Sequence, residues 1–169
     1  METIESFPLR VDAAEAARTL VESDERMDRA TPHSILYYPY GVFAFEVRAE
    51  ALLNSFREKV TCAVDLINEK ELLVDEQPTP EQRSVPQQNV LSTPHSVADV
   101  ESAARTYLFE VTQQRLKLVR TPTLRALSRA LLYRPFHALE CTTVSGDEYD
   151  YVVDGVSGKF HRIYLDTRR

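Results

Sequence analysis

The chain has 169 residues, of which 43% are hydrophobic and 27% charged, and it carries a net charge of −6. This composition is typical of a soluble globular protein, and no apolar run approaches the roughly 20 residues that cross a bilayer. The acidic segment 1–7 lacks the apolar core of a signal peptide. We therefore expect a cytoplasmic protein that does not insert into a membrane.

The first part of the chain predicts a helix followed by strands. Asp12 is a good N-cap, and Glu15 completes a capping-box pattern three residues later. The apolar residues that follow recur at helical spacing, which predicts an amphipathic helix with one buried face. Residues 36–47 are rich in aromatic and β-branched side chains that alternate, which predicts a strand. Residues 60–65 and 71–75 are shorter strand candidates around a turn.

The middle of the chain predicts a linker. The segment from Asp75 to Pro94 holds four prolines and four glutamines and has no convincing apolar period. Residues 77–95 are therefore expected to form a loop or polyproline segment, long enough to swing one unit around the other. The same segment can also be ordered against the surface.

The second part of the chain starts with another helix. Ser96 is a good cap, and a longer apolar stripe at helical spacing follows it. A cap-then-proline signal stands at 121–122. The spacing of Leu124, Leu127 and Leu131 then predicts a short helix.

The last third predicts antiparallel strands. Residues 133–143 and 148–154 alternate in polarity and flank 144–147, which has the composition of a hairpin loop. Gly158 provides a turn into a last strand over 159–165. This part of the chain therefore predicts a hairpin followed by a turn and a last strand.

Three motifs of the first half recur in the second half in the same order. The matched pairs are 12–19 with 99–106, 37–40 with 133–136, and 64–70 with 153–159. We therefore predict an α+β fold of two tandem repeats, each an amphipathic helix plus antiparallel strands, arranged with pseudo-two-fold symmetry. The predicted boundaries are 1–76 for the first repeat, 77–95 for the linker and 96–169 for the second repeat.

Residues 149–160 read Tyr-Asp-Tyr-Val-Val-Asp-Gly-Val-Ser-Gly-Lys-Phe. This segment resembles the closing hairpin of PepSY-type domains, which reads like Tyr-x-Val-x-Val-Asp-Ala-x-Thr-Gly-Glu-Val. The amphipathic helix before it fits the same layout, whereas the first repeat has a turn at Asn68 and Glu69 without glycine. The resemblance implies a small α+β module that binds or inhibits a partner, and it carries no catalytic residue to this chain.

The two cysteines predict structural positions. Cys62 and Cys141 lie in alternating, strand-like segments and outside any metal-binding spacing. Buried thiols are therefore expected rather than metal ligands, and a disulfide is not expected in a reducing cytosol. We expect no metal and no cofactor.

The Tyr-x-Pro motifs carry a cluster of aromatic residues. Aromatic side chains beside a strand proline can line a groove for a ligand or an extended peptide. They can equally form the core between helix and sheet. The candidate partner surface consists of Tyr37, Tyr38, Tyr40, Tyr133, Arg134 and Phe136.

A second set of candidates combines two acids and two histidines. Asp65 and Asp154 end equivalent strands, so they can form a carboxylate pair for a cation or for acid–base work. The simpler interpretation, which we prefer, is that each accepts backbone hydrogen bonds in its own turn. His137 and His161 lie on facing strands and can approach each other, but a third metal ligand is missing.

The stretch from Arg115 to Arg134 holds six cationic residues and no acid. Such a stretch can bind phosphate or nucleic acid. No aromatic residues of a known nucleic-acid module accompany it, so nucleic acid is not expected, and the stretch is predicted to face the acidic first unit or a second subunit. The anion-binding candidates are Arg115, Lys117, Arg120, Arg125 and Arg129.

These observations favour a non-enzymatic protein-binding or regulatory module that acts through the Tyr-x-Pro surfaces. We expect it to engage a protein partner or to associate with itself. The alternative is a small-molecule-binding protein or hydrolase that uses Asp65, Asp154, His137 and His161 in a cleft between the repeats. Nucleophile motifs and a glycine-rich phosphate loop are absent from the sequence.

Overall fold

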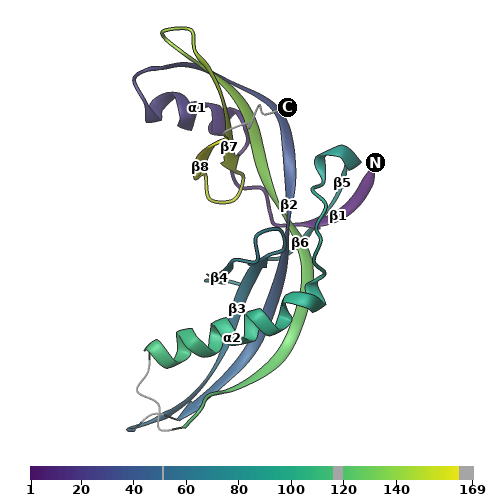
Figure 1. Cartoon of the computed structure of the whole chain (residues 1–169), viewed down its shortest axis with the longest axis vertical. Coiled ribbons are helices and arrows are strands. Elements are labelled where there is room, and N and C mark those ends of the chain that lie inside the picture. The colour runs from purple at the N-terminus through teal and green to yellow at the C-terminus, as the bar shows by residue number, and fades with distance from the viewer. Residues whose placement is uncertain (51, 116–119, 164–169) are drawn as a thin grey trace. The chain divides into compact units, whose positions relative to one another are not determined.

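The computed structural model describes residues 1–50, 52–115 and 120–163. Within these ranges the chain has an α+β fold of two α-helices and one mixed, eight-stranded sheet, which confirms the predicted class (Figure 1). The elements are β1 (Glu2–Ser6), α1 (Ala13–Ser23), β2 (Met27–Glu50), β3 (Ser55–Asp65), β4 (Glu71–Val74), β5 (Glu81–Val85), the 3₁₀-helix η1 (Gln87–Asn89), α2 (Val97–Arg115), β6 (Thr123–Thr143), β7 (Glu148–Asp154) and β8 (Phe160–Ile163). None of the helices in these ranges has the length and apolarity that crossing a membrane requires.

The sheet is organised around two long strands. Its order is β4-β3-β2-β6-β1-β5, and β7 pairs with β6 while β8 pairs with β7. β1 runs parallel to β6, whereas β2 with β3, β6 with β7 and the outer pairs are antiparallel.

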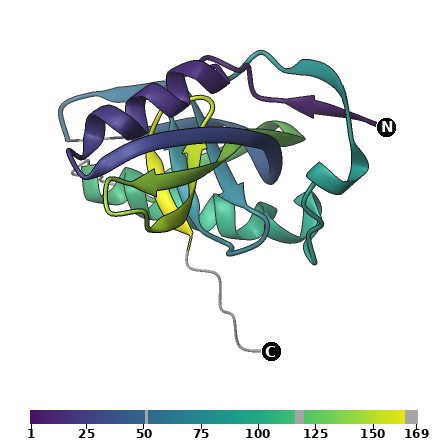
Figure 2. The same ribbon diagram turned by 90° about the horizontal axis from the view of Figure 1, so that it is seen from above.

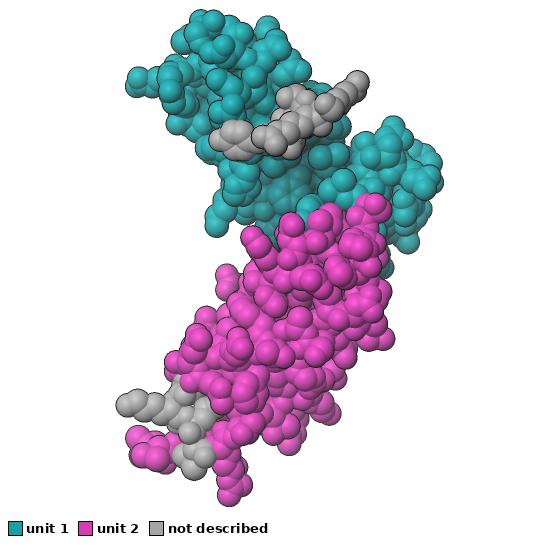
Figure 3. Space-filling view, in the orientation of Figure 1, with its two compact units in different colours: residues 1–38, 80–91, 133–169 teal, residues 39–79, 92–132 magenta. Residues whose placement is uncertain are grey.

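The chain divides into two compact units, coloured separately in Figure 3. The described part of unit 1 comprises 1–38, 80–91 and 133–163, and that of unit 2 comprises 39–79 and 92–132. β2 and β6 each contribute residues to both units, so each unit draws on both halves of the sequence. The consecutive repeats at 1–76 and 96–169 were inferred from matching sequence motifs, and they stay a prediction.

In unit 2, α2 packs on one face of the sheet. Phe43 and Phe45 of β2 point toward the helix, together with alternate residues of β3. The core of the unit consists of Phe43, Phe45, Cys62, Val64, Leu66, Val100, Ala104 and Leu108. We call the face opposite α2 the outer face of unit 2.

In unit 1, α1 packs on β2, β6 and β7 (Figure 2). The buried members of this core are Ala16, Leu20, Met27, Leu139, Cys141 and Val153. The capping box predicted for the helix is present, because Asp12 Oδ1 accepts from Glu15 N at 2.8 Å and the Glu15 carboxylate accepts from Asp12 N. We call the face opposite α1 the outer face of unit 1.

The short helix predicted around Leu124, Leu127 and Leu131 is wrong, because these residues belong to β6. Leu124 packs against the core under α2, whereas Leu127 and Leu131 are 43% and 39% exposed. The three leucines therefore do not share one buried face. β6 pairs with β2, which is remote in sequence, and the local sequence pattern does not reveal this pairing. The pairing outweighs a helical spacing that only three residues support.

The predicted linker is ordered in part, as the second interpretation of this segment allowed. It contains β5 and η1, and β5 pairs with β1 from Glu2 opposite Val85 to Ser6 opposite Glu81. Neither strand was predicted, because each is short and carries few apolar residues. Their stability depends on each other and on the cluster of Ile4, Tyr37 and Val85.

Candidate functional site

Each Tyr-x-Pro motif lies inside a long strand and holds a neighbouring turn. Pro39 O accepts a hydrogen bond from Leu66 N at 3.2 Å, and Pro135 O accepts one from Gly155 N at 2.8 Å. Both prolines are buried, and neither has an N–H group that would need a partner. The motifs therefore fix the turns that follow β3 and β7.

Both turn aspartates have the structural role that we preferred. Asp65 Oδ1 accepts from the backbone N–H groups two and three residues later, at 2.8 and 2.9 Å. Asp154 Oδ1 does the same at 2.8 and 3.3 Å. Asp154 Oδ2 also accepts from Arg134 Nε at 2.8 Å. The predicted capping of both turns is confirmed, and it accounts for the spacing of these acids.

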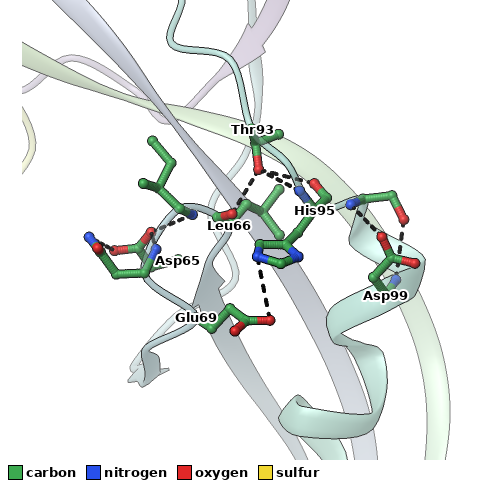
Figure 4. Close-up of polar contacts among 9 residues, drawn as sticks. Asp65, Leu66, Glu69, Thr93, His95 and Asp99 are labelled. Carbon is green, nitrogen blue, oxygen red and sulfur yellow. Dashed lines mark hydrogen bonds and ion pairs between the residues drawn. The ribbon is translucent and has the colours of Figure 1, made fainter.

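The Asp65 turn is tied to the start of α2 (Figure 4). Thr93 Oγ1 donates to Leu66 O at 2.7 Å, and His95 Nε2 lies 3.6 Å from the Glu69 carboxylate. Ser96 then begins the helix, because Asp99 N donates to Ser96 Oγ at 3.2 Å. The turn thus positions the helix of its own unit.

The two histidines of the alternative site point to opposite faces of the sheet. His137 lies opposite Val153 and is 1% exposed, with Nε2 donating to Val11 O at 2.6 Å. His161 lies opposite Val152 and is exposed. Because successive side chains of a strand alternate, the two rings do not approach each other, although the sequence allowed it. The described residues contain no group of three His, Cys, Asp or Glu that would hold a metal ion.

The predicted aromatic surface is split between the two faces of the strands. Tyr37 is 5% exposed and packs in the cluster with Ile4 and Val85, against which Tyr133 also packs. The alternative interpretation, core packing, therefore applies to these two rings.

The other members of the aromatic set are half-buried. The rings of Tyr38 and Phe136 meet edge to face at 6.0 Å between centroids. Phe136 lies opposite Asp154, the partner of Arg134, which places these side chains on the outer face of unit 1. In unit 2, Tyr40 lies opposite Asp65. The half-buried aromatics thus remain accessible on the face away from the helix.

The outer face of unit 2 carries a cluster of cations around one carboxylate. Arg48 lies directly opposite Arg57, and Glu46 lies directly opposite Lys59. Arg125 approaches the same carboxylate from β6. We call Arg48, Arg57, Lys59 and Arg125 the basic face.

Glu46 holds three of these cations. Its carboxylate accepts from Arg57 at 2.8 Å, from Arg48 at 3.0 Å and from Arg125 at 3.3 Å. The hydrogen bond from Arg57 and the charge of Arg125 hold the pKa of Glu46 below its usual value. The three guanidinium side chains are themselves 57–63% exposed. The half-buried carboxylate of Glu46 therefore leaves most N–H donors of the three guanidinium groups directed toward solvent.

The basic face continues into a hollow of 480 Å³ at the end of the β2–β3 hairpin. Arg48, Arg57 and Arg120 line it, and Arg120 Nε lies 3.6 Å from the Glu50 carboxylate. The lining also includes the Phe56 ring and the hydroxyl residues Ser55, Thr121 and Thr123. An arginine-lined hollow of this kind fits carboxylate or phosphate oxygens.

The predicted anion-binding residues are distributed unequally. Arg125 joins the basic face and Arg120 lines its hollow, whereas Arg129 pairs with Glu101 of α2 at 3.6 Å. Arg115 ends α2, and Lys117 lies outside the described residues.

Sequence reasoning missed Arg48, Arg57 and Lys59, because they lie in the acidic half of the chain. The alternation of Glu46 and Arg48 along one strand, and of Arg57 and Lys59 along the next, is the signal that could have found them.

The outer face of unit 1 carries the opposite charge. Glu140 lies directly opposite Asp150, and Glu148 lies opposite Thr142. We call Glu140, Glu148 and Asp150 the acidic face. In the part of the chain that the structure describes, none of the three forms an ion pair.

Both cysteines are buried and unpaired, as predicted. Burial, together with the charge of Glu71, raises the pKa of the Cys62 thiol to about 12. Burial, followed by the charges of Asp150 and Glu140, raises the pKa of the Cys141 thiol to about 11. Protonated, buried thiols of this kind react slowly.

No protein family, curated protein or solved structure matches this chain. The PepSY resemblance of residues 149–160 therefore stays a prediction.

Proposed function

We propose that this chain is a non-enzymatic protein-binding module that engages a partner through the outer faces of its units. The observation that carries the proposal is the basic face. Like charges directly opposite each other on neighbouring strands destabilise a sheet, and Arg48 faces Arg57 in this way. Glu46 offsets part of this repulsion within the fold, and carboxylates of a partner would offset the positive charge that remains on the basic face.

The chemistry of the basic face suits an acidic protein surface. Arginine side chains can bind carboxylates through two parallel N–H···O bonds, and Arg48 and Arg57 each already donate one bond to Glu46. Leu127, two residues beyond Arg125 on β6, adds exposed apolar area on the same face by strand alternation. Arginine is one of the residue types that are enriched among the side chains contributing most to protein interfaces.

The outer face of unit 1 supplies a second recognition element. The Tyr38 and Phe136 rings and the Arg134 side chain, all half-buried, lie beside one another there. Arg134 is fixed by Asp154 at 2.8 Å and stacks over the Phe7 ring, 5.5 Å from its centroid. Aromatic rings held in this way can contact a partner with little further loss of side-chain freedom.

The proposal includes a duplicated module with pseudo-two-fold symmetry, and matching hydrogen bonds support it. Leu91 N donates to Tyr37 O at 3.0 Å, and Phe7 N donates to Tyr133 O at 2.9 Å. The Pro39 and Pro135 bonds described above repeat the same relation at the turns. When the two halves are aligned on these bonds, the helix cap Asp12 corresponds to the helix cap Ser96. The sequence motifs had instead paired Asp12 with Asp99.

In this duplication the repeats exchange elements. α1, from the first half of the chain, packs on β6 and β7 of the second half. α2, from the second half, packs on β2 and β3 of the first half. Exchange of equivalent elements between copies is a common outcome of duplication and dimerisation.

The alternative of a small-molecule site or hydrolase gains no observation of its own. Asp65 and Asp154 hold their turns, and the His137 ring bonds to Val11 O. These interactions account for the two carboxylates and for His137 Nε2, whereas His137 Nδ1 is buried without a hydrogen-bond partner among the described residues.

The test is a pull-down of the tagged full chain from its native lysate, with mass spectrometry of the retained proteins. The informative variant is Lys59→Glu with Arg125→Glu, which leaves Arg48 and Arg57 to hold Glu46. The matched control is Arg18→Glu with Lys159→Glu, which makes the same charge change at exposed positions of unit 1.

The proposal expects a reproducible partner that the wild type and the control retain and the basic-face variant loses. Circular dichroism and urea midpoints establish that all three proteins are folded. Equal retention of the same proteins by all three would overturn it.

A further inference from the structure

We propose that the acidic face of a second copy of this chain binds the basic face. This inference rests on the proposed function, because it names the partner of the same surface. It is an interaction between copies, and it uses surfaces that the fold leaves exposed in each unit.

The two faces match in charge. The basic face has four cations around the single carboxylate of Glu46, so it keeps an excess of three positive charges. The acidic face has three carboxylates, and none of them forms an ion pair with a described residue. Each face therefore carries the charge that the other lacks.

The two faces also match in spacing. Arg48 and Arg57 are directly opposite each other on β2 and β3, and Glu140 and Asp150 are directly opposite each other on β6 and β7. Directly opposite residues on neighbouring antiparallel strands are about 4.5–5.5 Å apart at their Cα atoms in any sheet. A row of carboxylates on one copy can thus meet a row of guanidinium groups on the other at the same interval.

Apolar residues adjoin both faces. Leu127 and Leu131 are exposed on β6 in unit 2. In unit 1, Val152 neighbours Asp150 along β7, and Ile163 lies opposite Asp150. Both residues are half-buried. An apolar contact beside paired charges is the usual composition of a specific interface.

Charge also predicts how the association responds to salt. Two copies with a net charge of −6 each repel at long range. At about 0.15 M salt, repulsion beyond roughly 8 Å is screened, whereas ion pairs in contact are weakened less. Association is therefore expected to be strongest at intermediate ionic strength and to weaken again at high salt.

The experiment is sedimentation equilibrium of the full chain at concentrations up to about 100 µM, a range that detects weak association. At about 0.15 M salt, the mass is expected to rise from one chain toward at least two chains. Lys59→Glu with Arg125→Glu makes both faces acidic, and Glu140→Lys with Glu148→Lys makes both faces basic. Each variant alone is expected to self-associate on the order of 30-fold more weakly than the wild type.

The decisive step is to mix the two variants in equal amounts. One then presents acidic faces and the other basic faces, so association is expected to return in the mixture only. A variant that had lost its fold would not regain binding in this way. If a reversal does unfold the chain, the neutral pair Lys59→Gln with Arg125→Gln takes its place, with a weaker but still reduced association expected.

Two outcomes overturn the inference. The wild type can remain a single chain at every concentration and salt, or the mixed variants can fail to associate while the wild type does. If the wild type stays single but the basic-face variant still loses its lysate partner, self-association is wrong and the proposed function stands. If that variant also keeps every lysate partner, both are wrong.

Discussion

The two units use one local plan and present opposite charge. In each, a helix covers one face of the sheet and an aspartate holds the turn after a strand. Lys59 and Glu148 stand the same number of residues before the turn aspartates, yet one is a cation and the other an acid. The comparison teaches that the buried face and the turns constrain the fold, while the residues of the outer face are free to diverge.

The units also differ in how they satisfy the turn. Asp65 Oδ2 accepts from the Asn68 side chain at 3.3 Å, whereas Asp154 Oδ2 accepts from Arg134 at 2.8 Å. The residue with positive φ is Glu69 at 54° in unit 2 and Gly158 at 77° in unit 1. The same backbone is therefore built with a glycine in one unit and without one in the other.

The largest effect is expected from removing the main helix anchor in either unit. Leu108→Ala in α2 and Leu20→Ala in α1 each delete a fully buried side chain, at a cost of about 2–5 kcal/mol in unfolding free energy. Because β2 and β6 run through both units, urea unfolding followed by circular dichroism is expected to show one transition for each variant. Separate transitions would mean that the units unfold independently.

A smaller loss is expected from Gly155→Ala. An added Cβ would lie 2.9 Å from Pro135 O, which is held in a hydrogen bond, and 2.6 Å from the Leu9 side chain. Overpacking of this kind costs about 1–3 kcal/mol, measured by the urea midpoint. Gly41→Ala is the control, because its nearest contact is the Phe43 side chain at 3.1 Å, and it should cost less. Equal losses would contradict the role assigned to the Pro135 bond.

The turns give a pair of substitutions with opposite expected signs. Gly158→Ala places a Cβ at positive φ and should destabilise by about 1 kcal/mol. Glu69→Gly removes that strain, although the freer unfolded chain offsets part of the gain, so a change of only a few tenths of a kcal/mol is expected. Thermal unfolding measures both, and a large loss in Glu69→Gly would show that the two turns are not equivalent.

The smallest effect concerns Glu46 and pH. Its pKa is lowered in the folded state, so its contribution to stability is present above the unfolded value near 4.5 and is lost as the pH falls through the lower folded pKa. Wild-type urea midpoints should therefore fall on acidification in this range by more than those of Glu46→Gln. Parallel profiles would mean that the three arginines do not stabilise the Glu46 carboxylate.

The sequence determined the local features of this protein. The caps at Asp12 and Ser96 begin the two helices, and the aspartate turns at 65 and 154 form as predicted, because each depends on hydrogen bonds between residues a few positions apart. The burial of the two thiols was predicted from strand alternation, which is also a local pattern of the sequence.

The tertiary structure decided what depends on distant partners. Residues 124–131 became a strand and β1 and β5 formed because each found a neighbour remote in sequence. The basic face arose in the same way, since β2, β3 and β6 bring Arg48, Arg57 and Arg125 to one carboxylate. Strand pairing and register, which no local pattern encodes, placed these charges together.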